Sequence, residues 1–213
     1  MATDNDWEQC NSETFWGEVA PCSHVLQLYE DDEALLNLLE DFAVGGFSVD
    51  DTVMVIATPE HLAELKRRLR EDGLDLEKLC SSNKFIAISA DEMLSRFMRE
   101  GMPDEQLFIQ AVTGVFDNVR NSKRHIRVFG EMVAILWEQN NREATIRLEN
   151  MWNAFFEKES FALFCAYPKS EFSNEAASSL SCICSAHAKI ISNVGAPRFD
   201  VSYQNTTTPG LRA

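Results

Sequence analysis

Residues 52–57, TVMVIA, form an unbroken apolar run that constrains the fold more than any other stretch of the chain. Strands buried on both faces of a parallel sheet have this composition. The run leads into PEHLAELKRRLREDG, in which Pro59 suits the first turn of a helix and Gly73 suits its end. The leucines of that segment fall on one side of the helix. A buried strand followed by an amphipathic helix predicts one unit of an α/β fold.

The same unit repeats along the chain. Strands are predicted at residues 24–29, 52–57, 84–89, 127–130 and 161–167. Helices separate them; the first helix is expected to stop at Gly45 and Gly46, and a last helix is expected over Asn174–Asn193. Because strands that alternate with helices pair in parallel through right-handed crossovers, we predict a three-layer α/β/α sandwich with a mostly parallel five-stranded sheet.

One domain is predicted. Residues 1–22 show no clear period and are expected to form an N-terminal arm, and residues 23–195 form the domain. Residues 196–213 are rich in Gly, Pro and Thr and are expected to form a loose tail.

The charge of the chain limits its partners. A formal net charge of -15, from 34 acidic and 19 basic residues, repels phosphate backbones and anionic membranes. The only dense basic run, residues 65–70, has the leucine spacing of an amphipathic helix. We therefore expect no direct contact with nucleic acid or membrane. No apolar run is long enough to cross a bilayer and the N-terminus is acidic, so a cytoplasmic protein is expected.

The 6 cysteines include no C-x-x-C pair, so they indicate neither a disulfide framework nor a zinc ribbon. Reduced thiols are expected. Cys184 and His187 fall on one face of the predicted last helix, but two ligands do not make a zinc site. No metal site and no cofactor are therefore predicted.

The loop after the first strand is strongly acidic. Ligand sites in open α/β sheets lie at the carboxyl ends of the strands, and this loop holds Glu30, Asp31, Asp32 and Glu33 without glycine or lysine. The chain also lacks the G-x-x-x-x-G-K-[ST] motif, so a P-loop is not expected. Acidic residues in a first helical turn cap the helix and complement its dipole, and we favour that role over a cation site.

Several polar residues lie at the ends of the predicted strands. Tyr29 and Tyr167 end their strands, and His61 lies in a first helical turn from which it could reach a ligand. His24 opens the first strand at the opposite end of the sheet, where a structural role is favoured. Glu131 stands where a strand runs into a helix; its carboxylate could cap that helix or point into the crevice at the sheet edge, and both roles stay open.

Four stretches of the chain resemble the MEDS domain family, the methanogen and methylotroph sensory domain. They are residues 24–65, 88–104, 127–153 and 161–168, and they occur in the family's order. The run GEMVAILW followed by LENMW is the most specific part, and the H-x-x-x-x-Y spacing of the first strand supports it.

The resemblance implies a RecA-like fold related to clock-protein ATPases, with the P-loop lost, and a sensory role in bacterial or archaeal signalling. The positions that match the family's characteristic polar residues are His24, Tyr29, Glu131, Trp137, Glu149 and Trp152, and more loosely His61 and His187. The match favours a ligand-facing or site-organising role for Glu131 over a helix cap.

These features predict a non-catalytic sensor that binds a small organic or cationic ligand at the strand ends. The predicted ligand-binding residues are Tyr29, His61, Glu131, Tyr167, His24 and Trp137. Members of the family often continue into an output domain, whereas only residues 194–213 follow the last predicted helix here. The signal is therefore expected to pass to a partner protein such as a histidine kinase or a transcription regulator, and a homodimer also stays open. The alternatives are a RecA-like ATPase with a rebuilt phosphate site and a protein-interaction scaffold.

Overall fold

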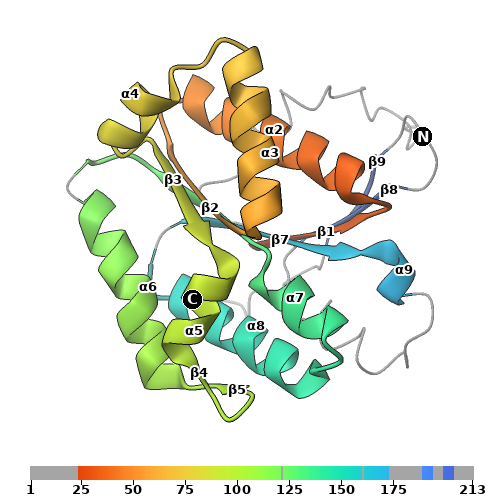
Figure 1. Cartoon of the computed structure of the whole chain (residues 1–213). Helices are drawn as coiled ribbons and strands as arrows, with labels where there is room; N and C mark the ends of the chain where they lie inside the picture. Colours follow the sequence, from red (N-terminus) through yellow and green to blue (C-terminus); the bar gives the residue numbers. More distant parts are fainter. Residues whose placement is uncertain (1–23, 121, 160, 173–188, 194–198, 204–213) are drawn as a thin grey trace, which may run out of the picture.

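The computed structural model describes residues 24–120, 122–159, 161–172, 189–193 and 199–203 (Figure 1). The strands of this part are β1 (His24–Tyr29), β2 (Thr52–Ala57), β3 (Phe85–Ser89), β4 (Met98–Arg99), β5 (Met102–Pro103), β6 (Ile126–Gly130), β7 (Ala162–Pro168), β8 (Lys189–Asn193) and β9 (Phe199–Tyr203). The helices are α2 (Asp32–Ser48), α3 (Pro59–Glu71), α4 (Leu76–Ser81), α5 (Ala90–Phe97), α6 (Glu105–Arg120), α7 (Met132–Glu138), α8 (Arg142–Phe156) and α9 (Lys169–Phe172). The predicted arm, residues 1–22, lies outside the described residues.

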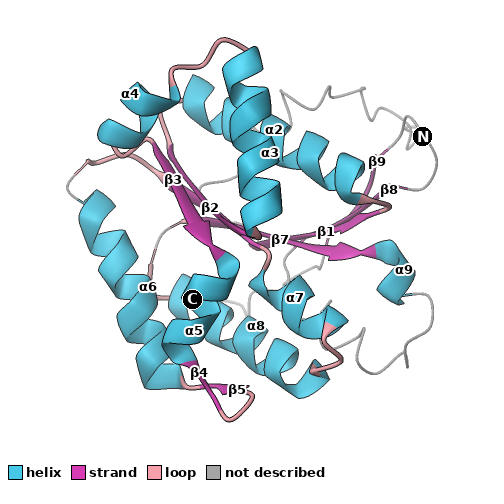
Figure 2. Ribbon diagram, viewed as in Figure 1, coloured by secondary structure: helices cyan, strands magenta, loops and turns pink. Residues whose placement is uncertain are grey.

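The main sheet has 7 strands in the order β3-β2-β6-β7-β1-β8-β9. Neighbouring strands from β3 to β8 are parallel, and β9 alone runs antiparallel to its neighbour β8 (Figure 2). The five predicted strands are β1, β2, β3, β6 and β7, and all of them are confirmed. They lie side by side, so the predicted parallel sheet forms the centre of the molecule.

Two predictions near the C-terminus are wrong. Residues 189–193, which were assigned to the end of the last helix, form β8 beside β1, and the rest of that predicted helix up to residue 188 lies outside the described residues. Residues 199–203, within the predicted loose tail, form β9. Five residues with two adjacent isoleucines satisfy a strand as well as a helical turn, so pairing with β1 decides the conformation of KIISN.

Helices cover both faces of the sheet, as predicted. Helices α2, α3 and α4 share one hydrophobic core with one face of the sheet, and α5, α6, α7 and α8 share another core with the opposite face (Figure 1). Strand β2 contributes to both cores, with Met54 and Ile56 on one face and Val53 and Val55 on the other. The three-layer α/β/α architecture is therefore confirmed. Among the helices of the described residues, none has the length and apolar character needed to cross a membrane.

Helix α2 was predicted to stop at Gly45 and Gly46. This prediction is wrong, because the helix continues to Ser48. Both glycines are buried, and a Cβ atom on Gly46 would lie 2.5 Å from Val53 Cγ2 and 2.8 Å from Arg127 Cδ. Gly46 therefore permits close packing of α2 on β2 and β6 and does not end the helix.

Replacing Gly46 with alanine is expected to lower the free energy of unfolding by about 1–3 kcal/mol, because the added methyl group overlaps Val53 and the Arg127 stem. Gly114→Ala in α6 is the matched control. Its new Cβ meets no atom within 4 Å, so the better helix propensity of alanine should raise stability by roughly 0.5–1 kcal/mol. Urea denaturation followed by circular dichroism measures both, and equal effects of the two substitutions would contradict this packing role.

Aromatic rings fill the core beneath α5, α6 and α8. The ring of Phe108, which is 0% exposed, meets Phe97 and Trp152 edge to face at centroid distances of 5.4 and 5.1 Å. Phe155 and Phe161 extend this group, with ring centroids 5.9 Å apart. These rings join α6 and α8 to each other and to the segment that enters β7.

Candidate functional site

The carboxyl ends of β1, β2 and β6 lie together at one edge of the sheet. Ile56 near the end of β2 pairs with Gly130 at the end of β6, so the residues that follow these strands are neighbours. Glu131 follows β6, Thr58 follows β2, and Tyr29 ends β1. The fold therefore brings three of the predicted ligand-binding residues, Tyr29, His61 and Glu131, to one place.

The Glu131 side chain connects β6 to the start of α3. Its own backbone N–H donates to Ile56 O at 2.9 Å, and its Oε2 accepts a hydrogen bond from Thr58 N at 2.8 Å. Its Oε1 lies 2.7 Å from His61 Nδ1. Although Glu131 is the N-cap residue of α7, its side chain makes no capping bond to that helix. The Glu131 side chain therefore does not cap α7, and its hydrogen bonds go to α3 and the residue before it.

His61 occupies the first turn of α3, which Thr58 caps by accepting from His61 N at 3.3 Å. Because a carboxylate oxygen only accepts, the contact with Glu131 places a proton on His61 Nδ1. The other ring nitrogen, Nε2, lies 3.8 Å from Asp32 Oδ1 in the first turn of α2. The His61 side chain is 15% exposed and that of Asp32 is 79% exposed. His61 thus lies between the N-termini of α2 and α3, with Nε2 toward the exposed carboxylate of Asp32.

The carboxylates around this edge set the protonation of the other groups. The hydrogen bond to Glu131 is the main cause of a raised pKa for His61, with Asp32 and Glu60 adding to it against the opposing effect of burial. Burial raises the pKa of Tyr29 far above its usual range, and the charges of Glu131, Glu138 and Asp32 act in the same direction. Tyr29, which is 4% exposed, therefore stays a neutral hydroxyl at any physiological pH.

The acidic loop after β1 has the structural role predicted for it. Asp31 caps α2 by accepting from Ala34 N at 2.9 Å, and Glu33 pairs with Arg68 of α3 at 2.7 Å. Glu30 pairs with Lys169 at 2.5 Å. Asp32, which approaches His61, is the member of the loop that faces the candidate site.

The other predicted residues lie on the opposite face of the sheet. Tyr167 is buried in the core under α7 and α8, and its hydroxyl donates to Glu149 Oε1 at 2.5 Å. Trp137 of α7 packs edge to face on Tyr167 with ring centroids 6.1 Å apart. His24 is 2% exposed and lies near Glu149 and Cys165. The predicted set thus divides into a group at the sheet edge, in which only His61 is partly exposed, and a buried group on the opposite face.

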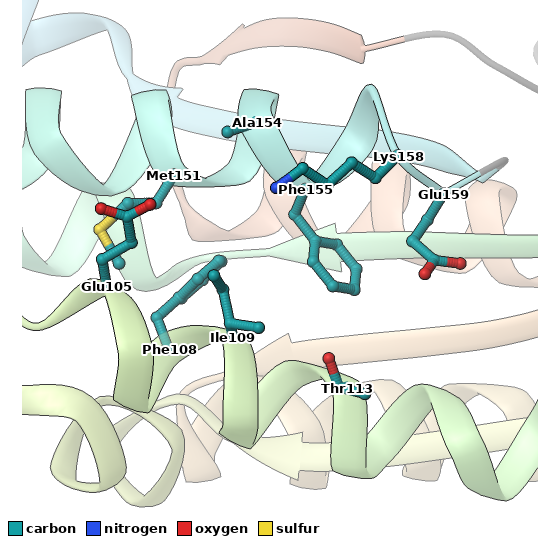
Figure 3. Close-up of a pocket in the computed structure, with 9 residues that line it drawn as sticks. All are labelled: Glu105, Phe108, Ile109, Thr113, Met151, Ala154, Phe155, Lys158 and Glu159. Carbon is teal, nitrogen blue, oxygen red and sulfur yellow. The ribbon is translucent and has the colours of Figure 1, made fainter.

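A groove of about 140 Å³ lies apart from both groups, between α6 and α8 (Figure 3). Its floor is apolar and its ends carry charged side chains; the lining residues are Glu105, Phe108, Ile109, Thr113, Met151, Ala154, Phe155, Lys158 and Glu159. Ile109 is 40% exposed there. The groove holds none of the residues that were predicted to bind a ligand.

The His61–Glu131 pair makes stability depend on pH. Because the native pKa of His61 is raised above its ordinary value of 6.5, the stabilisation by this pair is complete below about pH 6.5 and is lost as the pH rises through the native pKa. The difference in free energy of unfolding between wild type and His61→Gln, measured by urea denaturation, should therefore be larger at pH 6 than at pH 9. In Glu131→Gln, an NMR titration should show the His61 pKa lowered; an unchanged value would contradict the pairing.

A protein-family model described as "MEDS: MEthanogen/methylotroph, DcmR Sensory domain" matches residues 23–187. The chain belongs to the MEDS family. It is thereby a sensory domain of the signalling class, and the match includes both groups of polar residues. No curated protein matches this MEDS domain in sequence.

Solved structures show the fold of this MEDS domain in other proteins. A KaiC-like protein from the hyperthermophilic archaeon Pyrococcus horikoshii OT3 is similar with a TM-score of 0.58 and 13% identity, over 89% of this chain and 83% of that one. Another protein from P. horikoshii OT3 is similar with a TM-score of 0.56 and 12% identity, over 93% and 94% of the two chains. At this identity the likeness establishes the fold, which is RecA-like as the family resemblance implied.

Several groups at the Glu131–His61 pair and around the buried Glu149 could not be predicted from the sequence. The backbone N–H of Thr58 binds Glu131, and no side-chain pattern signals such a contact. Cys165 is one of 6 cysteines that show no motif spacing, and Asn153 gave no signal. Glu149 did give a signal in the sequence, because it matches a characteristic position of the family. In the structure it is a buried carboxylate, 1% exposed, among the apolar residues of α8.

Proposed function

We propose that this MEDS domain is a non-catalytic sensor that binds a small organic or cationic ligand at the carboxyl edge of its sheet and passes the bound state to a partner protein. The observation that carries the proposal is the fixed Glu131–His61 pair. A buried carboxylate held by Thr58 N orients a partly exposed imidazole whose second nitrogen lies 3.8 Å from the exposed Asp32. Orientation of a partly exposed polar group by a buried one is typical of binding sites.

The charges around His61 favour a ligand with an amine or hydroxyl group. Asp32 and Glu131 lie against the imidazole, and Glu30 and Glu33 stand in the same loop. A loop that holds four carboxylates and neither glycine nor lysine disfavours phosphate. An ammonium or hydroxyl group beside Asp32 could donate to that carboxylate, and a ligand hydroxyl oxygen could in addition accept from His61 Nε2 when the imidazole is protonated. Tyr29 adds a neutral hydroxyl near the same carboxylates.

The same position gives the ligand a route to a partner. Asp32 lies in the first turn of α2 and His61 in the first turn of α3, so a ligand that bridges them contacts both helices. Farther along, Arg68 of α3 binds Glu33 and Asn37 of α2, each at 2.7 Å. A ligand shifts a conformational equilibrium only through different contacts in the two states, and bridging these helices supplies such a difference. A partner on the α2–α3 layer could detect it.

Calorimetry and thermal shift with a panel of small amines, alcohols and nucleotides test the proposal. Glu131→Gln and His61→Gln should each lower the affinity for a detected ligand by about 10-fold or more, because a hydrogen bond to a charged group contributes about 1.5–3 kcal/mol. Asp91→Asn is the matched control, since Asp91 is an exposed carboxylate in the first turn of α5 after β3. Equal affinity in wild type, Glu131→Gln and Tyr29→Phe would show that the ligand binds elsewhere.

The same samples separate the two alternatives. ATP hydrolysis above background that Glu131→Gln abolishes would favour an ATPase with a rebuilt phosphate site. A stable complex with a partner protein or a second copy, formed without any small ligand and unchanged by His61→Gln, would favour a scaffold; gel filtration and pull-down measure it.

A further inference from the structure

Three side chains of different types converge beneath α8. His24 comes from the start of β1, Glu149 from the middle of α8, and Cys165 from the middle of β7. One ligand atom from each lies within 4.8 Å of the other two. The exposed fractions are 2%, 1% and 1%, so the cluster is closed to bulk solvent. Imidazole nitrogen, carboxylate oxygen and thiolate sulfur are the ligands that zinc uses in proteins.

The spacing of these atoms matches a tetrahedral ion. His24 Nε2 lies 3.4 Å from Cys165 Sγ and 3.8 Å from Glu149 Oε2, and Sγ lies 4.0 Å from that oxygen. Zinc bonds of roughly 2.0–2.3 Å place tetrahedral ligands about 3.3–3.6 Å apart. Movements of a few tenths of an ångström would therefore bring all three atoms to bonding distance.

The neighbours of these ligands orient them for a cation. His24 Nδ1 lies 2.6 Å from Asn153 Oδ1, and because an amide oxygen only accepts, Nδ1 carries the proton and Nε2 presents its lone pair to the cluster. Tyr167 donates to Glu149 Oε1, so Oε2 is the oxygen that faces His24 and Cys165. A ligating histidine that donates its other N–H to an oxygen, together with a hydrogen-bonded carboxylate, is the usual surrounding of a protein metal.

Charge balance favours a divalent ion. A thiolate and a carboxylate carry two negative charges that cancel those of the cation, and the neutral imidazole adds none, so the filled site is neutral within an apolar core. The mixture of sulfur, nitrogen and oxygen ligands suits zinc better than magnesium or calcium, which prefer oxygen alone.

We propose that His24 Nε2, Glu149 Oε2 and Cys165 Sγ bind a zinc ion, with the fourth position left for water or another small ligand. Binding forms the zinc–sulfur bond as the thiol proton passes to solvent. The ion joins β1, β7 and α8, on the face of the sheet opposite His61. The site is independent of the sensor proposed above, because it shares no residue with the Glu131–His61 pair.

Metal content and cobalt spectroscopy of the purified chain test this site. After chelator treatment, wild type should bind a single equivalent of zinc, and cobalt in its place should give the thiolate-to-cobalt absorption of a tetrahedral site. Cys165→Ser should lose that absorption, whereas Cys80→Ser, which removes an exposed thiol, should keep it. Tyr167→Phe should lower the affinity for zinc by about 10–100-fold, because it removes the hydrogen bond that orients Glu149.

Two outcomes would overturn the proposal. One is wild-type protein that takes up no stoichiometric zinc or cobalt, which would leave the cluster as a hydrogen-bonded group only. The other is a Cys165→Ser protein that keeps the thiolate-to-cobalt absorption, which would place the ion at another cysteine. If Cys165→Ser does not fold, the wild-type spectrum and the affinity of Tyr167→Phe still decide the question.

Discussion

Replacing Asp51 with alanine should lower the free energy of unfolding by about 3–5 kcal/mol, because it breaks a buried ion pair by removing the carboxylate bound to the Arg127 guanidinium. Asp51 Oδ2 accepts from Arg127 Nε at 2.9 Å and also from a terminal guanidinium nitrogen. Arg127 is 4% exposed and Asp51 is 8% exposed, and the guanidinium stands over the Phe42 ring at 5.6 Å. The two charges therefore pair where little solvent reaches them.

The double variant Asp51→Ala/Arg127→Met is the matched control for this ion pair. It removes both charges and keeps an apolar stem against Phe42, so it should be more stable than Asp51→Ala alone. Urea denaturation at neutral pH gives both values. A double variant that is less stable than the single one would show that the arginine stabilises the fold through contacts other than this pair.

Replacing Phe108 with alanine is expected to lower the free energy of unfolding by about 3–5 kcal/mol, because apolar burial is lost and a cavity remains. Its ring lies among Phe97 of α5 and Trp152 and Phe155 of α8 and is 0% exposed, and those large rings on two other helices cannot all move into the space. Circular dichroism during thermal and urea unfolding measures the loss.

The adjacent residue of the same helix provides the control. Ile109 is 40% exposed at the groove between α6 and α8, so Ile109→Ala should change stability by no more than about 0.5 kcal/mol. A large cost for Ile109→Ala would mean that the groove is covered by another part of the chain or by a second copy.

The architecture could be predicted because burial imposes a clear pattern on the central strands. Every residue of TVMVIA is buried, and the helix after it begins at Pro59 as the sequence indicates. The pattern fails where local sequence serves two structures equally well. Glycine ends many helices, but Gly46 lies inside α2 and allows that helix to approach β2. A short run such as KIISN fits either a helix or a strand.

The site could be predicted only in part, because strand order is not written in local spacing. The sequence placed Tyr29, His61 and Glu131 at strand ends, yet Glu131 and His61 are separated by 70 positions and meet only because β2 and β6 are neighbours. The His24–Cys165 contact spans 141 positions and depends on the pairing of β1 with β7. Rules for metal sites based on close cysteine and histidine spacing could not find it.

The place of β1 in the sheet also bears on how the chain reaches its fold. Among the described strands it comes first along the chain, but its neighbours are β7 and β8, at residues 162–168 and 189–193. A nascent chain that ends before β7 therefore carries β1 with both backbone edges unpaired. The sheet closes around β1 only after β7 and β8 have been made, and pairing over such sequence separations is slow and open to aggregation. Chaperone dependence during synthesis is the expected cost of this topology.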